Sequence, residues 1–288
     1  MAILFSDLTV ETAEQLSLTG KKARRLNGVD IKEKWQQGYA VTSISIRSNE
    51  ASRALGKPPG HYITVELQPY FQRQTGFFSR GVACLRRELL SLLPHLTSKS
   101  TILVVGLGNR NLICDAVGPK AIESLLVTRH LDTTRFSFVP VAAIAAGVVG
   151  QTGVETGELV QSLVRAISPA AVLVIDALCA HTRRRLCATI QLSDTGLIPG
   201  SGVDNHRTAI NHETLGVPVV ALGIPTVIAG STLARELTGE TAQEKDGLFL
   251  TPQDVDSRVT ELSRLLGYAI TAALQPELTM EDITALLG

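Results

Sequence analysis

The sequence lacks several features that mark common protein classes. It has no excess charge of either sign, because 27 lysines and arginines balance 27 aspartates and glutamates among 288 residues. A neutral chain gives no electrostatic case for binding nucleic acid or an anionic membrane. The basic stretches KKARR (21–25) and HTRRR (181–185) are short, and we interpret them as solvated surface. No nucleic-acid partner is expected.

Cysteine is also scarce, and its spacing excludes the usual cysteine frameworks. The four cysteines form no CxxC pair, and the six histidines form no HExxH motif, so no metal or cofactor site is predicted from spacing. The N-terminus, MAILFSDLTVE, has no basic region followed by a long apolar run, which argues against a secretion signal. We therefore expect free thiols in a reducing cytoplasm.

One stretch without charge, TLGVPVVALGIPTVIAGSTLA (214–234), is long enough to cross a bilayer. It contains two prolines, three glycines and several hydroxyl groups. These residues favour a buried strand flanked by turns over a membrane-spanning helix. No membrane partner is expected.

From residue 101 onward the pattern alternates between strand and helix. Near-continuous apolar runs are typical of parallel strands that helices cover on both faces. The runs predict strands at 101–106, 136–144, 170–176, 187–192 and 217–223, with helices at 115–127, 155–167 and 251–275.

The first hundred residues follow a different pattern. Segments 38–46 and 61–67 alternate apolar and polar residues, which predicts half-buried antiparallel strands on either side of a turn at 56–60. Helices are predicted at 7–19, with Ser6 or Asp7 as the cap, and at 82–96.

Together these patterns predict one domain over residues 1–288 with an α/β, three-layer fold. Residues 101–288 would form the core, a mostly parallel sheet with helices on both faces. Residues 1–100 would add an N-terminal antiparallel strand appendage and a helix.

The segment TILVVGLGNRNLICDAVGP (101–119) places a glycine turn directly after a strand. A dinucleotide-binding loop would need a third glycine three positions after Gly108, where helix and strand pack closely. Asn111 stands there, Gly118 comes too late, and no acidic residue ends the following strand. The loop is therefore not interpreted as a nucleotide site.

The same segment instead delivers a carboxylate. Asp115 follows the strand at 101–106, and Asp176 ends the strand at 170–176. The carboxyl ends of parallel strands share one crevice, so the two side chains are expected to meet there. Two nearby carboxylates tend to hold one proton between them, which supplies a general base and a general acid. The alternative, equally compatible with the pattern, is that both aspartates cap the segments that follow them.

Two long glycine-rich loops follow other strands, at 145–158 and 193–207. Loops at strand ends are where binding sites are built, so Glu155, Asp194 and Ser201 are candidates for polar contacts with a substrate. Their alternative role is turn chemistry, which is favoured for Ser201.

Many of these segments, in this order, resemble the germination protease family of spore-forming bacteria. The resemblance runs from the N-terminal DLTVE to the C-terminal helix. It includes the segments GKPPGHYITVE, VVGLGNRNLICDAVGP, VTRHL, GVVGQTGVET, IDAL, TIQLSDTGLIPGSGV, NHETLGVPVVALGIPTV and LTPQDVD.

The resemblance implies an endopeptidase that cleaves small acid-soluble spore proteins during germination, with two aspartates that fall on Asp115 and Asp176. It also implies a phosphorylase/hydrolase-like α/β fold, similar to that of hydrogenase-maturation endopeptidases, with the site at the strand ends. Within the matched motifs, Asn109 and His130 are candidates for supporting or substrate-binding roles.

The family resemblance further implies a zymogen, a homotetramer and a location in the cytoplasm of the spore core. Only MAILFS precedes DLTVE here, so a curtailed or absent propeptide is expected, and the segment before LTPQDVD is shorter than usual. This sequence also departs from the family pattern at single positions, namely Cys114, Ala146, Cys179, His181, Asp204 and Ala229.

Three other functions remain open from the sequence. Cys114 or Cys179 could act with His181 as a cysteine peptidase, although small buried cysteines are common. A metal could assist the site carboxylates, or the scaffold could be retained in a non-catalytic spore protein.

Overall fold

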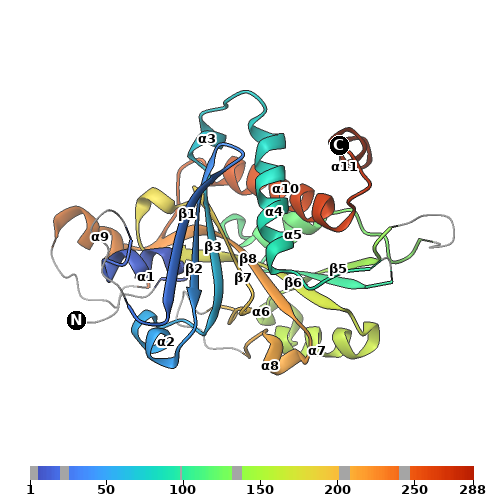
Figure 1. Ribbon diagram of the computed structural model, residues 1–288, viewed down its shortest axis with the longest axis horizontal. Coiled ribbons are helices and arrows are strands. Elements are labelled where there is room, and N and C mark those ends of the chain that lie inside the picture. The colour runs from blue at the N-terminus through green and yellow to red at the C-terminus, as the bar shows by residue number, and fades with distance from the viewer. Residues whose placement is uncertain (1–5, 20–25, 98, 132–137, 201–207, 240–246) are drawn as a thin grey trace.

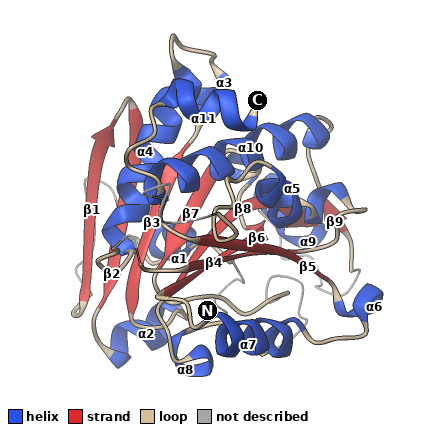
Figure 2. Ribbon diagram, turned by 90° about the vertical axis from the view of Figure 1, so that its right-hand side faces the viewer, coloured by secondary structure: helices blue, strands red, loops and turns tan. Residues whose placement is uncertain are grey.

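The computed structural model describes residues 6–19, 26–97, 99–131, 138–200, 208–239 and 247–288. They form one nine-stranded sheet between two layers of helices (Figures 1 and 2). The strand order is β1-β2-β3-β7-β8-β6-β4-β5, and β9 pairs with β8. The predicted three-layer α/β class is confirmed.

The parallel part of the sheet is built from four strands. Their side chains alternate between two cores, so that in β4 Ile102 and Val104 face one helical layer and Leu103 and Val105 face the other. This burial on both faces explains the near-continuous apolar runs. In spatial order the strands are β8 (Val219–Ala229), β6 (Ala171–Ala180), β4 (Ile102–Leu107) and β5 (Val141–Gly147).

The other part of the sheet is antiparallel, so the sheet as a whole is mixed rather than mostly parallel. The strand predicted at 187–192 is antiparallel to both of its neighbours. Through it the N-terminal antiparallel strands are appended to the parallel strands in one continuous sheet. These strands are β1 (Val29–Gln36), β2 (Tyr39–Ile46), β3 (Gly60–Glu66), β7 (Thr189–Ser193) and β9 (Phe249–Leu250).

One face of the sheet is covered by the longest helices. Helix α10 packs against α4 and α5, and most of its side chains are buried because it lies across the centre of this layer (Figure 2). The helices of this layer are α3 (Gln68–Phe71), α4 (Phe77–Leu92), α5 (Val117–Glu123), α10 (Val255–Leu274) and α11 (Met280–Leu287).

The opposite face carries two smaller groups of helices. Helices α1 (Thr9–Gln15) and α2 (Asn49–Leu55) cover the antiparallel strands, and their apolar residues share a core with Ile44 and Ile46 of β2. Helix α7 (Thr156–Ile167) covers β4 and β5 and contacts the short α8 (His212–Leu215). Two further helices, α6 (Val149–Thr152) and α9 (Gly230–Thr238), follow β5 and β8.

Several predicted boundaries are wrong in informative ways. Leu8 occupies the N-cap position of the N-terminal helix and makes no side-chain cap hydrogen bond, so neither Ser6 nor Asp7 is its cap residue. Strand β6 does not end at Asp176 but continues to Ala180. Strand β1 and helices α2, α9 and α11 were not predicted. The uncharged stretch 214–234 is mainly β8, and within the described part of the chain no helix is long and apolar enough to span a membrane.

Candidate functional site

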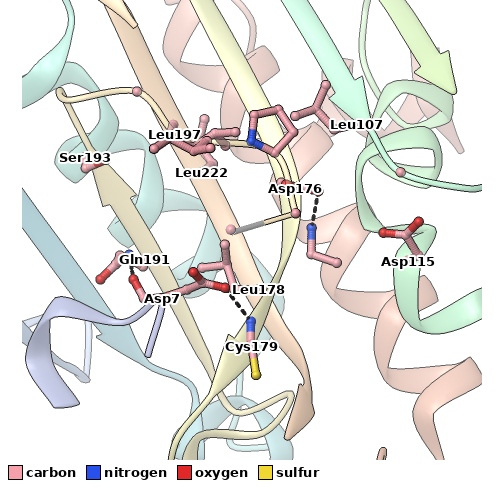
Figure 3. Close-up of a pocket in the computed structure, with 18 of the residues that line it drawn as sticks. Asp7, Leu107, Asp115, Asp176, Leu178, Cys179, Gln191, Ser193, Leu197 and Leu222 are labelled. Carbon is pink, nitrogen blue, oxygen red and sulfur yellow. Dashed lines mark hydrogen bonds between the residues drawn. The ribbon is translucent and has the colours of Figure 1, made fainter. Parts of the chain in front are cut away.

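A cavity of about 520 Å³ opens at the carboxyl ends of β4 and β6. Both predicted acids line it, although one comes from the loop after β4 and the other from β6 (Figure 3). Two further charged side chains, Asp7 and Lys57, complete the charged part of its described lining. The cavity wall is otherwise rich in leucines such as Leu107 and Leu178. A mostly apolar wall with a few charged side chains is the usual composition of a substrate pocket.

Asp115 is held by the backbone of its own loop. It ends the short 3₁₀ turn η1 (Ile113–Asp115), and its Oδ2 accepts a hydrogen bond of 2.7 Å from the Asn109 N–H. The residue at the cap position of α5 is Ala116, and no side chain caps that helix. The interpretation of Asp115 as a helix cap is therefore wrong, and the backbone of Asn109 holds its carboxyl group within the loop.

The glycines of this loop make room for Asp115. Gly108 has a φ of +107°, and a Cβ there would collide with the carbonyl oxygen of Asp115. Gly106 has no such φ; instead a Cβ there would meet the backbone of Gly118 at the start of α5. Gly118 therefore allows the close packing of helix on strand, and the turn brings a carboxylate to the cavity.

Asp176 lies inside β6, opposite Gly223 of β8. Only 9 % of its surface is exposed, and its Oδ1 accepts a hydrogen bond of 2.9 Å from the Ala177 N–H. A residue in the middle of a strand caps no helix, so the cap interpretation is wrong here as well. Gly223 is required beside it, because a Cβ there would come within 2.5 Å of the Leu178 side chain.

Lys57 is the one basic side chain in the described lining of the cavity. Its Nζ donates hydrogen bonds to the carbonyl oxygens of Ser6 at 2.8 Å and Asp7 at 3.2 Å. Desolvation lowers the pKa of Lys57, while the nearby charges of Asp7 and Glu11 act in the opposite direction. Its two hydrogen bonds to carbonyl oxygens fix the amino group at the end of the cavity that the N-terminal segment forms.

The cysteines of the cavity are poorly suited to nucleophilic attack. Burial raises the pKa of Cys179 to about 12, and burial together with the Asp115 charge raises the pKa of Cys114. Burial lowers the pKa of His181, whose Nδ1 is buried without a hydrogen-bond partner and which is not part of the cavity lining. A thiolate is the reactive form of cysteine, so these environments disfavour the cysteine-peptidase alternative.

Glu155, Asp194 and His130, which were also predicted as site residues, are not part of the described cavity lining. Glu155 caps α7 by accepting from the Gly157 N–H, and Asp194 accepts from the His61 N–H and pairs with its Nδ1, each at 2.7 Å. His130 is exposed in a turn and is not part of the cavity lining. Ser201 and Asp204 fall outside the described residues.

Two residues of the cavity were missed by sequence reasoning. Asp7 and Lys57 lie in the DLTVE and GKPPG segments, which were noted as motifs but given no chemical role. Each segment contains a charged residue, which could have marked it as a candidate, but the sequence spacing of Asp7 and Lys57 does not connect them to β6. As for metals, no group of three or more His, Cys, Asp or Glu side chains in the described ranges is arranged to hold an ion.

Comparisons with known proteins agree with one another on the family. A family model described as germination protease matches residues 2–243. A germination protease of Clostridium perfringens is 37 % identical over 326 aligned residues and is covered over 98 % of both chains. A germination protease of Caldanaerobacter subterraneus is 34 % identical, and the match covers 98 % of this chain and 97 % of that relative. One from Bacillus cereus is 40 % identical over 77 % of this chain and 62 % of the relative.

Among solved structures, the chain is similar to a NiFe hydrogenase maturation protease from Thermococcus kodakarensis. The match covers 64 % of this chain and 98 % of that one, with 18 % identity and a TM-score of 0.37. At this score the similarity carries no argument, and the fold assignment above rests on the strands and helices of this chain.

Proposed function

Since the chain belongs to the germination protease family and is a peptidase, we propose that Asp115 and Asp176 together carry its reaction. The observation that carries the proposal is that both carboxyl groups line one cavity at the strand ends, although they come from separate elements. Strand ends of a parallel sheet are where α/β proteins bind their ligands. Neither residue caps a helix, which removes their main structural alternative.

The pair would act as general base and general acid on a peptide bond. Two carboxyl groups that meet in one cavity tend to resist double ionisation, so in the proposed reaction one would hold a proton while the other is charged. The charged one takes a proton from water as the water oxygen attacks the carbonyl carbon, and the protonated one gives its proton to the leaving amide nitrogen. The backbone N–H groups of Asn109 and Ala177 orient the two carboxyl groups for these transfers.

We propose small acid-soluble spore proteins as the substrate, in the cytoplasm of the spore core. Cleavage in a partly enclosed cavity requires an extended chain, because a folded loop would first have to unfold before its backbone reached Asp176. We also propose that the protein is a homo-oligomer made as a zymogen, with a tetramer as the first arrangement to test by light scattering. A single monomeric species would contradict the assembly proposal.

The test is cleavage of a purified small acid-soluble spore protein by Asp115→Asn and Asp176→Asn. Asparagine keeps the shape and still accepts the backbone hydrogen bond, but it cannot take or give the proton. Each change should lower kcat by about 10³-fold or more, with an unchanged thermal unfolding midpoint. Asp256→Asn, at an exposed position on α10, is the matched control and should cleave normally.

Three outcomes of the cleavage assay separate the alternatives. Near-normal cleavage by either aspartate variant would refute the paired-acid mechanism. Loss of activity on adding a chelator, restored by a divalent ion, would favour the metal-assisted alternative. Absence of any cleavage by the wild-type protein would favour the non-catalytic alternative.

A further inference from the structure

The strand that carries Asp176 projects past its neighbour. The last β4 partner of β6 lies opposite Ile175, while β6 continues to Ala180 paired with β8 alone. Asp176 is thus the first residue of this projecting segment, residues 176–180, which we call the β6 overhang. The register to β8 shifts between Leu178 and Cys179, so pairing with β8 is irregular where support is needed.

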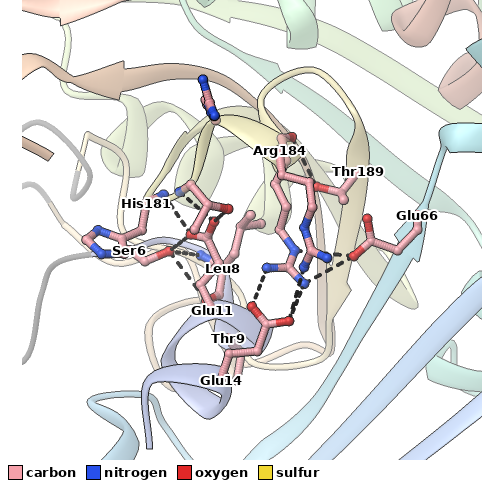
Figure 4. A network of polar contacts seen from close by, with 12 residues as sticks. Ser6, Leu8, Thr9, Glu11, Glu14, Glu66, His181, Arg184 and Thr189 are labelled. Carbon is pink, nitrogen blue, oxygen red and sulfur yellow. Dashed lines mark hydrogen bonds and ion pairs between the residues drawn. The ribbon is translucent and has the colours of Figure 1, made fainter. Parts of the chain in front are cut away.

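The far end of the overhang is held by two carboxylates from the N-terminus. The Asp7 Oδ2 accepts from the Cys179 N–H at 2.8 Å, and the Asp7 N–H donates to the Cys179 carbonyl oxygen at 3.3 Å (Figure 3). Glu11 accepts from the His181 N–H at 2.7 Å and the Thr182 N–H at 2.9 Å (Figure 4). Three backbone donors in a stretch of four residues therefore point at charged oxygens, which form stronger hydrogen bonds than neutral acceptors.

These two carboxylates are themselves firmly anchored. Glu11 is 1 % exposed, and both of its oxygens accept hydrogen bonds, including one each from the Ser6 and Thr182 hydroxyl groups. The half-buried Asp7 is held through its main chain, because its backbone carbonyl oxygen accepts from the Lys57 Nζ and from the Gln191 Nε2 at 3.0 Å. A buried carboxylate is costly unless it is fully hydrogen-bonded, so this arrangement belongs to the framework of the cavity.

We propose that Asp7 and Glu11 are positioning residues for the reaction. Through the backbone of residues 179–182 they fix the β6 overhang, and so fix the Asp176 carboxyl group relative to Asp115. The proposal rests on the proposed function in that Asp176 must be a reacting group. Misplacement of a reacting group by about 1 Å costs on the order of 100-fold in rate, which sets the size of effect to expect.

The activity test uses conservative and disruptive changes at the two positions. Asp7→Ala removes the acceptor for Cys179 and should lower kcat by about 10- to 100-fold with KM within about twofold. Asp7→Asn keeps one acceptor oxygen and should restore kcat to within about threefold of wild type. Unlike Asp7→Asn, Glu11→Gln should not keep kcat near the wild-type value. Both Glu11 oxygens accept hydrogen bonds from backbone N–H groups, and in glutamine the amide nitrogen would face one of these donors.

Glu14→Gln is the matched control for general loosening of α1. Glu14 lies on the same helix but binds Arg185 at 2.6 Å and not the backbone of 179–182. It should lower the unfolding midpoint while leaving kcat within about twofold. A kcat loss in Glu14→Gln equal to that in Asp7→Ala would overturn the proposal, as would a normal kcat in Asp7→Ala. An Asp7→Asn variant as slow as Asp7→Ala would also overturn it, because the charge itself would then be needed.

Amide hydrogen exchange tests the same proposal without any cleavage. In folded Asp7→Ala, peptides covering 177–182 should exchange at least tenfold faster than in wild type, while peptides covering β4 stay unchanged. Equal protection of 177–182 in the two proteins would overturn the positioning role. Because this measurement needs no substrate, a failure of the aspartate-pair mechanism and a failure of the positioning proposal are distinguishable.

Discussion

The two cavity aspartates are held in place in opposite ways. The loop of Asp115 is fixed by close packing, since Gly108 leaves no space for a side chain and Gly106 lies against Gly118. The strand of Asp176 is instead fixed at its far end by the carboxylates of Asp7 and Glu11. The first arrangement should be sensitive to added volume, whereas the second should be sensitive to lost hydrogen bonds.

The difference also separates what is local from what is distant. Asp115 and its partner Asn109 are six residues apart, so the loop closes on itself. Asp7 and Cys179 are 172 residues apart, and their contact forms only when α1 has docked on the sheet. Interference with the N-terminal segment should therefore disturb Asp176 and leave the Asp115 loop intact.

Among changes outside the two aspartates, the largest expected effect comes from adding volume to the Asp115 loop. Gly108→Ala should lower activity at least 100-fold and stability by about 3 kcal/mol, because the methyl group meets the Asp115 carbonyl and φ is +107°. Gly153→Ala is the control, since φ is +68° there but the space is open; it should cost about 1 kcal/mol. Equal effects of the two changes, measured by thermal unfolding and cleavage, would show that packing around Asp115 is not critical.

The next effect concerns the ion network that attaches α1 to the sheet. Arg185 is 2 % exposed and bonds to Glu14 at 2.6 Å and Glu66 at 3.2 Å. Arg185→Met should lower the free energy of unfolding by about 3 kcal/mol, because it removes the buried partner of Glu66 and leaves Glu14 with the exposed Arg184. Arg184→Met, which removes an exposed arginine bonded to the same Glu14, should cost less than about 1 kcal/mol. Denaturant unfolding measures both variants. Similar losses of unfolding free energy would contradict the larger contribution expected of the buried Arg185.

A smaller effect is the pH dependence of the same network. Burial raises the pKa of Glu14, but Arg185 and Arg184 outweigh it and hold that pKa below its ordinary value of 4.5. The ionised Glu14 therefore stabilises the fold above about pH 4.5, and this contribution is lost as pH falls through its folded pKa. Burial raises the pKa of Glu66 despite Arg185, so its contribution has the opposite sign.

The Glu14 contribution can be isolated by subtraction. The stability difference between wild type and Glu14→Gln should be constant near neutral pH and shrink as pH falls below about 4.5. Urea unfolding at a series of pH values measures it. A difference that grows on acidification would show that the Glu14 carboxylate is not the stabilising form.

The smallest effect is expected from the cysteines. Burial raises the pKa of Cys179 to about 12, so almost no thiolate exists at neutral pH. The cleavage rates of Cys114→Ala and Cys179→Ala should each be within tenfold of wild type. Cys179→Ala also keeps the backbone N–H that donates a hydrogen bond to Asp7. Rapid inactivation of the wild-type protein by iodoacetamide at pH 7 would contradict the expectation that neither cysteine is a nucleophile.

Local patterns explain why much of the fold could be predicted. The apolar runs at 101–106 and 170–176 predicted β4 and β6, because a strand covered on both faces consists almost entirely of apolar residues. The alternation at 38–46 and 61–67 predicted β2 and β3 and their antiparallel pairing. Strand β1 was missed because Trp35 and its charged neighbours are exposed at the sheet edge, which leaves no apolar pattern.

The candidate site was predictable only in part, because local patterns locate strand ends but not contacts between distant segments. A strand-end location placed Asp115 and Asp176 in one crevice, because parallel strands align their carboxyl ends. The length of β6 was underestimated, since the polar Asp176 looked like the end of an apolar run while β8 continues to pair beyond it. Asp7 and Lys57 reach the cavity only through long-range docking, which no local spacing encodes.

The central claim, that Asp115 and Asp176 act as one unit, is tested most directly by a double-mutant cycle. The kcat of Asp115→Asn, Asp176→Asn and the double variant would be measured on one purified small acid-soluble spore protein. Residues that act as a unit are not additive, so the double variant should be no more than about threefold slower than the slower single variant. Losses that multiply, with the double variant slower by the product of the two single effects, would contradict the paired mechanism.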